Sequence, residues 1–219
     1  MANQAVTKTV SDQLATALRD RIIDGQIAPG QRLLQEEVAR DFNVSITPVR
    51  EAITRLAALG IVKADARRGA QVVSPTARDL TECYAIRLAL EPLALEWAVP
   101  NFTATDLKRL DELVAEMQDV TDPQRYVELN HQFHGALYER ANSERLCSIV
   151  ESVRSQAAVY LLMLGRAAGS DLQKVEEHAN EDHRRILEAC RQRDTATAVQ
   201  VLRAHLDEGL ASVRRALGL

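Results

Sequence analysis

Three of the five histidines in this 219-residue chain fall on the apolar stripes of predicted helices, where a polar ring is unusual. His134 lies four residues after Asn130, so the two side chains share one helix face. His183 and His205 lie in the stripes of two later predicted helices. Imidazoles that converge inside a helical bundle, with a polar side chain beside them, are what a divalent metal site requires. We therefore predict that Asn130, His134, His183 and His205 bind a metal ion.

Two alternatives stay open for this cluster. Each histidine taken separately is more often a hydrogen-bonded core residue than a ligand, and the cluster would also suit a metal-free pocket for a polar effector. Imidazoles combined with water or carboxylate suit zinc, nickel or manganese equally well. The other two histidines, His131 and His178, fall on other helix faces and are predicted to be solvated.

An arginine on an earlier predicted helix is a candidate effector ligand. Arg87 precedes Glu91 by one helical turn. If Arg87 faces a cavity in the bundle, it can bind a carboxylate effector through two parallel hydrogen bonds. The alternative is a solvent-exposed ion pair with Glu91, which stabilises a helix by only about 0.3 to 0.5 kcal/mol.

These residues need a scaffold, and residues 76–219 predict one that is helical almost throughout. Hydrophobic periodicity, breaks at Pro100 and Asn142, and a capping box from Ser170 to Gln173 divide the segment into helices. The predicted helices cover residues 77–99, 105–120, 123–141, 144–164, 170–193 and 195–217. Six helices with short connections predict an antiparallel bundle.

The first 75 residues follow a different pattern. Apolar positions recur at helical spacing in residues 10–23, 35–42 and 48–59. Along the third of these segments one face is apolar, while Thr47 and Arg50 lie outside it. Two β-rich runs then flank a basic, glycine-containing loop at residues 64–70, which predicts a hairpin. Short helices joined by a tight turn and followed by a hairpin predict a winged helix-turn-helix domain over residues 1–75.

The segment that begins at Pro29 resembles the winged helix-turn-helix of GntR-family bacterial transcription regulators, through the run PGQRLLQEEVARDFNVSITPVREAITRLAALGIVKADARRGAQV. The specific parts are the PG turn, the VS-x-TPVREA core and the RRGA-x-V wing. The resemblance implies contacts with double-stranded DNA by Thr47, Arg50, Arg67, Arg68 and Gly69. Ile46 stands where the family usually has arginine, so the operator sequence cannot be carried over.

The bundle resembles the FCD-type effector domain of the FadR branch of the same family, through the pieces NHQFH, EDHRRILEA and RAHLDEGL. In that domain an Asp-x3-His pair on one helix and single histidines on the last two helices hold a metal. Asn130 stands where many members have aspartate, and its uncharged amide weakens metal binding unless an anionic effector compensates. Six helices match the shorter subgroup rather than the seven-helix, fatty-acyl-binding one.

Composition and charge agree with a helical protein that has two different halves. Hydrophobic residues make up 46% of the chain and aromatic residues only 4%, which is typical of a helix-rich protein with a substantial core. Residues 1–75 carry 10 basic and 8 acidic side chains, whereas the remainder carries 17 and 23. The net charge of -4 argues against nonspecific coating of nucleic acid, but the slightly basic first segment suits an anionic partner.

Cysteine usage and hydropathy predict a cytoplasmic location. The three cysteines form no CxxC pair, which argues against a disulfide framework or a zinc ribbon. No signal peptide or apolar run of 18 residues is present, so we expect no contact with membranes.

The leading expectation is a ligand-responsive transcription regulator, and specifically a repressor. It would act as a homodimer on a palindromic operator and would bind a small organic or sugar acid in residues 76–219. The rival is a metal-dependent enzyme with a three-histidine site, but no general base such as the glutamate of HExxH accompanies the histidines. A third reading is a metal that only stabilises a dimerisation domain.

Overall fold

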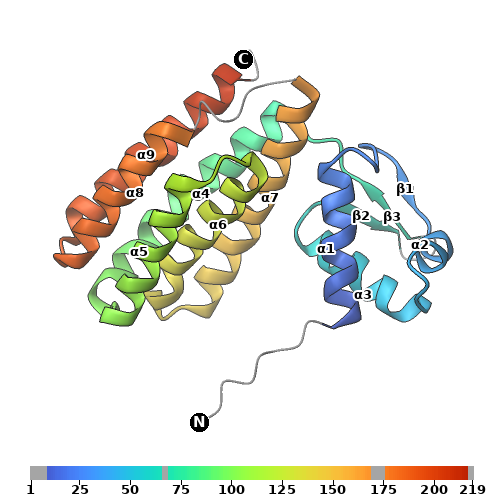
Figure 1. The fold of residues 1–219 in the computed structure, drawn as a ribbon, viewed down its shortest axis with the longest axis horizontal. Helices are drawn as coiled ribbons and strands as arrows, with labels where there is room; N and C mark the ends of the chain where they lie inside the picture. The colour runs from blue at the N-terminus through green and yellow to red at the C-terminus, as the bar shows by residue number, and fades with distance from the viewer. Residues whose placement is uncertain (1–8, 66–68, 169–175, 217–219) are drawn as a thin grey trace, which may run out of the picture. The chain divides into compact units, whose positions relative to one another are not determined.

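The computed structural model describes residues 9–65, 69–168 and 176–216. The chain divides into two compact units, Met1–Pro75 and Thr76–Leu219, and each is described by itself (Figure 1). The division falls between Pro75 and Thr76.

The first unit is a winged helix-turn-helix, as predicted. Its helices are α1 (Val10–Ile23), α2 (Gln35–Asp41) and α3 (Ile46–Ala58), and its strands are β1 (Arg32–Leu33), β2 (Val62–Asp65) and β3 (Gly69–Val72). The three strands form an antiparallel sheet in the order β1-β3-β2. The core forms where α1 packs on α3, and it buries Leu14, Leu18, Ile22, Val49, Ile53 and Leu56.

Two details of this unit differ from the prediction. Helix α3 begins at Ile46 rather than at Pro48, with Ser45 as N-cap. The earlier start is possible because the amide groups of a first helical turn need no helical partner, so Pro48 is tolerated at the third position. Strand β1 is too short to show a periodicity, and the sequence reading missed it.

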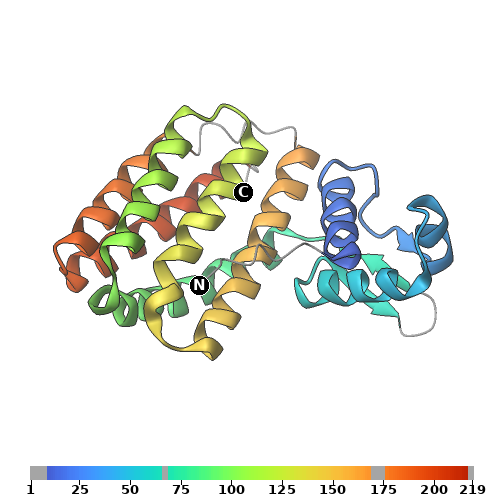
Figure 2. The same ribbon diagram turned by 60° about the horizontal axis from the view of Figure 1, so that its bottom comes forward.

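The described residues of the second unit form a bundle of six α-helices, and this fold class is confirmed. Its helices are α4 (Ala77–Ala98), α5 (Ala104–Asp119), α6 (Pro123–Tyr138), α7 (Glu144–Ala168), α8 (Glu176–Arg191) and α9 (Thr195–Ala216). Figures 1 and 2 show these helices packed side by side. The predicted capping box at Ser170 lies outside the described residues, and α7 continues four residues past its predicted end. In the described part of the chain, no helix has the length and hydropathy needed to cross a membrane.

Helix α4 is central to the bundle and packs against α6, α7 and α9. A buried proline, Pro92, interrupts its hydrogen-bond ladder because proline has no amide hydrogen for the carbonyl of Leu88. Arg203 of α9 donates to that carbonyl oxygen at 3.2 Å. The contact joins α4 to α9, the helix that carries His205.

Candidate functional site

Helix α3 of the first unit presents a polar row to solvent. Its apolar face is buried, and its outer face exposes Thr47, Arg50 and Thr54. The Arg50 guanidinium donates to Gln35 Oε1 of α2 at 2.9 Å, while the side chain stays exposed. An exposed arginine on a short helix after a tight turn is the arrangement that reads guanine edges or phosphates in the major groove.

Arg55, another arginine of α3, contacts α1. Arg55 donates from Nη1 to the carboxylate of Asp12, a residue of the capping box that begins α1. This ion pair links two helices that already share the core of the unit. We therefore separate Arg55, which ties α3 to α1, from Arg50, whose hydrogen bond to α2 leaves it exposed.

The predicted wing contacts divide into described and undescribed residues. Arg67 and Arg68 lie outside the described residues. Gly69 opens strand β3 and is buried. Its φ is +114°, and an added Cβ would lie 2.0 Å from the Leu33 carbonyl oxygen of β1. Only glycine fits there, so Gly69 closes the hairpin onto β1, and its burial argues against the direct DNA contact expected for it.

The second unit brings His134, His183 and His205 together from α6, α8 and α9. One ring nitrogen from each lies within 4.8 Å of the corresponding nitrogens of the other two. The ring centroids are 4.7 to 5.4 Å apart, so the imidazoles pack directly on one another. Two of the rings are fully buried, and the His205 residue is 9% exposed.

Several polar atoms at this cluster have no hydrogen-bond partner among the described residues. They are Asn130 Oδ1, His134 Nε2 and both ring nitrogens of His183, and all are buried. Buried polar groups are almost always hydrogen-bonded, because leaving one unpaired costs about 1 to 3 kcal/mol. Nitrogen and oxygen atoms without hydrogen-bond partners, grouped beside converging imidazoles, could serve as ligands of a divalent cation. The group includes the amide oxygen of Asn130, which the sequence predicted as a ligand.

Burial also sets the charge state of the histidines. Desolvation lowers the pKa of His134 well below its ordinary value, and nearby His205, His183 and arginines lower it further. The pKa of His183 is lowered in the same way, by burial and then by His205. Both rings are therefore neutral near pH 7, which is the state in which an imidazole nitrogen can bind a metal.

A cavity of about 280 Å³ adjoins the cluster. Asn130 and His205 line it, so two of the four predicted ligands face this space. Asp182 also lines it, and the contact of its carboxylate with His205 Nδ1 at 3.6 Å lowers the pKa of Asp182. The other polar side chains of the wall include Tyr84, Arg87, Arg154 and Ser212.

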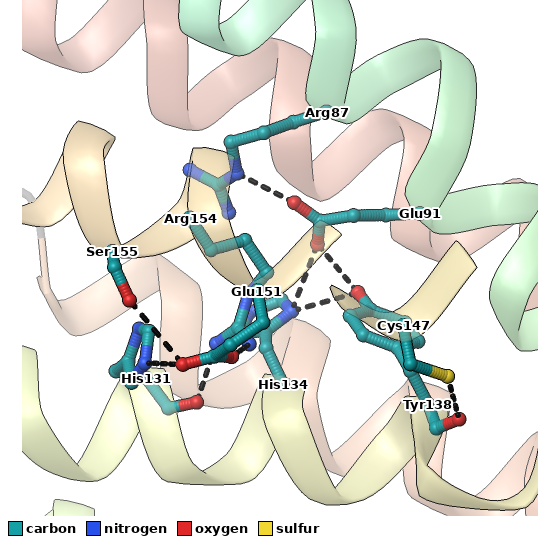
Figure 3. Close-up of polar contacts among 9 residues, drawn as sticks. All are labelled: Arg87, Glu91, His131, His134, Tyr138, Cys147, Glu151, Arg154 and Ser155. Carbon is teal, nitrogen blue, oxygen red and sulfur yellow. Dashed lines mark hydrogen bonds and ion pairs between the residues drawn. The ribbon is translucent and has the colours of Figure 1, made fainter. Parts of the chain in front are cut away.

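Arg87 lines this cavity and is also paired with Glu91, so both sequence readings apply to it in part. The side chains are 11% and 0% exposed, which excludes a solvated surface pair. Arg87 Nε donates to Glu91 Oε1 at 2.6 Å, and the other carboxylate oxygen accepts from the Tyr138 hydroxyl at 2.5 Å (Figure 3). Ion pairing with Glu91 raises the pKa of Arg87 despite its burial.

A second cavity arginine, Arg154 of α7, was missed by the sequence reading. Its side chain is 3% exposed, donates to Glu151 Oε2 at 3.1 Å and to the His131 carbonyl, and has a buried Nε without a hydrogen-bond partner among the described residues. Burial lowers the pKa of Arg154. Its position between the apolar Ala157 and Val150 gave no motif, and only the amphipathic pattern of α7 could have indicated that it points inward.

His131 corrects a smaller expectation. It was predicted to be solvated, but its side chain is 27% exposed, lines the cavity and contacts Glu151 Oε1 at 2.8 Å (Figure 3). The side chain of His178 lies outside the described residues. The cavity wall therefore carries more basic side chains than the sequence indicated, with the buried guanidinium groups of Arg87 and Arg154 alongside His131 and His205.

Comparison with known proteins matches each unit to a protein-family model. The model of "Bacterial regulatory proteins, gntR family" matches residues 10–72, and the model of the "FCD domain" matches residues 82–208. The uncharacterized HTH-type transcriptional regulator YdhC of Bacillus subtilis is 29% identical over 209 residues, covering 94% of this chain and 91% of that protein. The gluconate operon transcriptional repressor of Bacillus licheniformis is 26% identical over 199 residues, covering 90% and 82%.

The solved structure of Escherichia coli McbR/YncC has a TM-score of 0.75 at 26% identity and covers 95% of this chain and 99% of its own. The families and relatives matched are DNA-binding transcription regulators rather than enzymes, which removes the metal-dependent enzyme from consideration. This chain belongs to the GntR family of bacterial transcription regulators and carries the FCD effector domain of the FadR-type branch.

Proposed function

We propose that this regulator is a repressor that binds a palindromic operator as a homodimer and responds to a small organic or sugar acid. The acid would bind in the cavity of the FCD domain, beside a divalent metal held by the histidine cluster. The observation that carries the proposal is a group of buried, unpaired ligand atoms next to a cavity that Asn130, His205 and two buried arginines line. Repressor roles among the relatives support the sign of regulation.

On the DNA side, we assign direct operator contacts to Thr47 and Arg50 of α3. Both are exposed, and Arg50 has donors beyond the one that contacts Gln35. Arg67 and Arg68 of the hairpin would add phosphate or minor-groove contacts. A regulator that acts on bacterial DNA works in the cytoplasm.

A homodimer is supported by an apolar stripe on α4. Ile86 and Trp97 are 43% and 45% exposed, and the half-buried Leu90 and Leu93 lie between them at helical spacing. Contiguous exposed apolar side chains on a regular helix mark an interaction surface. Two copies joined there would present two recognition helices to the two halves of a palindrome.

In the FCD domain, Asn130, His134, His183 and His205 would hold the metal, with zinc, nickel and manganese as the candidates. When bound, the ion supplies a positive charge to which a carboxylate can bind. Arg87 and Arg154 would bind the remaining anionic groups of the effector, because guanidinium groups match carboxylates with paired hydrogen bonds. Binding of acid and of DNA would then be linked, each changing the affinity for the other by the same factor.

The test is a gel-shift titration on the DNA upstream of the regulator's own gene. We expect a saturable, salt-sensitive shift that one member of a panel of carboxylic and sugar acids releases when zinc is present. Arg50→Ala should weaken the shift by about 1 to 3 kcal/mol, roughly 5- to 150-fold. Arg78→Ala is the matched control, since Arg78 is 87% exposed on α4. A wild-type protein that gives no such shift in any effector state contradicts the proposal.

A further inference from the structure

A buried chain of hydrogen bonds connects the cavity arginine to one of the predicted metal ligands. Glu91 receives Arg87 on one carboxylate oxygen and the Tyr138 hydroxyl on the other, at 2.6 and 2.5 Å. The Tyr138 oxygen is in turn 3.2 Å from His134 Nδ1. Glu91 and His134 are fully buried and Tyr138 is 2% exposed, so water does not compete for these contacts (Figure 3).

The positions of the protons in this series of hydrogen bonds follow from the number of donors that each side chain has. Glu91 is ion-paired with Arg87 and acts only as an acceptor, so Tyr138 must use its single proton to donate to Glu91. The Tyr138 oxygen is then left as an acceptor, and the donor that faces it must be the Nδ1–H group of His134.

From this chain we infer that Glu91 and Tyr138 are positioning residues that hold His134 in its Nδ1-protonated tautomer. A neutral imidazole carries one N–H, so the tautomer leaves Nε2 with a free lone pair. This nitrogen is buried and has no hydrogen-bond partner among the described residues. The inference rests on the proposed metal site, and it adds that His134 is preset to bind the ion through Nε2.

The arrangement follows a general feature of metal sites. A ligating histidine usually donates its second N–H to an acceptor that fixes its tautomer, and loss of that partner lowers metal affinity by about 10- to 100-fold. His183 differs, because neither of its ring nitrogens has a hydrogen-bond partner among the residues that the structure describes. His134 is therefore held by a hydrogen-bonded partner where His183 is not, and its orientation comes from α4 through Glu91.

The same carboxylate also holds a residue of the cavity wall. Arg87 lines the cavity where the acid is proposed to bind, and Glu91 is the residue that connects Arg87 to Tyr138. An anion that binds the Arg87 guanidinium is therefore separated by two hydrogen bonds, Arg87–Glu91 and Glu91–Tyr138, from the tyrosine that holds His134. This series of hydrogen bonds would connect the proposed acid site to the proposed metal site through defined atoms.

The first test reads the tautomer directly in the metal-free, full-length protein. Long-range ¹H–¹⁵N NMR correlations of the histidine rings distinguish Nδ1–H from Nε2–H, and a His134→Gln variant identifies the signals of His134. We expect His134 to be Nδ1-protonated. An Nε2-protonated His134 in the wild type overturns the inference.

The second test reverses the direction of the hydrogen bonds among Glu91, Tyr138 and His134 with a side chain of nearly the same shape. In Glu91→Gln the amide oxygen must face Arg87, so the NH₂ group faces Tyr138 and donates to it. Tyr138 then donates to His134 Nδ1, which moves the ring proton to Nε2. We expect the opposite tautomer in this variant, and a zinc affinity at least about 10-fold weaker in a chelator competition. A tautomer or a zinc affinity that does not change contradicts the inference.

A matched control is Glu151→Gln, which removes a carboxylate that contacts His131 and Arg154 in the same bundle. It should leave the His134 tautomer and the zinc affinity unchanged, and a change as large as that of Glu91→Gln counts against a specific role for Glu91. Wild-type protein that binds no zinc contradicts the proposed metal site, whereas the tautomer measurement still decides this inference. If Glu91→Gln does not fold, the wild-type tautomer remains the deciding result.

Discussion

At the scale of single residues, His183 is in an environment that does not favour a histidine in the metal-free protein. Its ring is fully buried against Phe133 and the other two imidazoles, and within the described residues neither ring nitrogen has a hydrogen-bond partner. A leucine at the same place would bury a similar volume without unpaired polar atoms. Packing does not explain the choice of histidine, whereas the metal binding proposed above would explain it.

We therefore expect His183→Leu to leave the metal-free protein as stable as the wild type, or to stabilise it by about 1 to 3 kcal/mol. Zinc should raise the midpoint of thermal unfolding of the wild type and leave that of the variant unchanged. Urea and thermal unfolding with and without chelator measure both effects. A strongly destabilised metal-free variant would indicate that His183 has a structural partner after all.

At the scale of elements, the start of α5 is stabilised by one carboxylate. Asp106 completes a capping box with Thr103 and receives two hydrogen bonds from Arg140, at 2.9 and 2.8 Å. These contacts lower the pKa of Asp106 well below its ordinary value, with the Arg140 hydrogen bonds as the largest cause. The ionised carboxylate thus holds the first turn of α5 and the segment that follows α6 together.

The sign of the pH effect follows from that lowered pKa. Stability from Asp106 is present above about pH 4, the ordinary pKa of an aspartate, and is lost as pH falls through the lower folded-state pKa. We expect Asp106→Asn to destabilise the protein by about 1 kcal/mol at pH 7, a value kept small by solvent screening. The difference from wild type should shrink below pH 4 in urea titrations. A difference that grows towards acid pH contradicts this assignment.

At the scale of the whole molecule, the proposed dimer surface on α4 would decide whether two recognition helices can act together. A double substitution, Ile86→Glu with Trp97→Glu, places charges on the proposed dimer surface and should give a monomer in light scattering. Operator affinity should then fall by at least about 10-fold, because a monomer engages only half of a palindrome. Ile149→Glu is the matched control, since Ile149 is 46% exposed on α7. A dimer that survives the double substitution must use another surface.

The sequence predicted the architecture because each unit follows a periodic pattern. The apolar faces of α1 and α3, and the short connections of the bundle, carry enough information to define both folds. The position of Ile46 as the first residue of α3 was not predictable, because Pro48 is acceptable at any position of a first turn. Strand β1 forms only because the hairpin pairs with it, and that long-range pairing leaves no local pattern.

For the candidate site, helical spacing was enough to select the three histidines that converge. Spacing cannot show which charges a cavity collects from different helices, so Arg154 was overlooked and His131 was judged to be solvated. The tyrosine that faces His134 was equally invisible, although Tyr138 lies one helical turn after it on α6. The metal, the acid and the DNA contacts remain predictions for the experiments above.

The neutral amide of Asn130 has a consequence for what the regulator measures. Three imidazoles and one amide would add no negative charge to the double charge of a bound ion, and the Asp182 carboxylate, 3.6 Å from His205 Nδ1, would offset only part of it. A negatively charged acid is what would balance that charge, so the ion and the acid would each be held best when the other is present. Such a site would work as a coincidence detector: it would report metal supply and acid supply together, where an aspartate at the same position would let the metal bind alone.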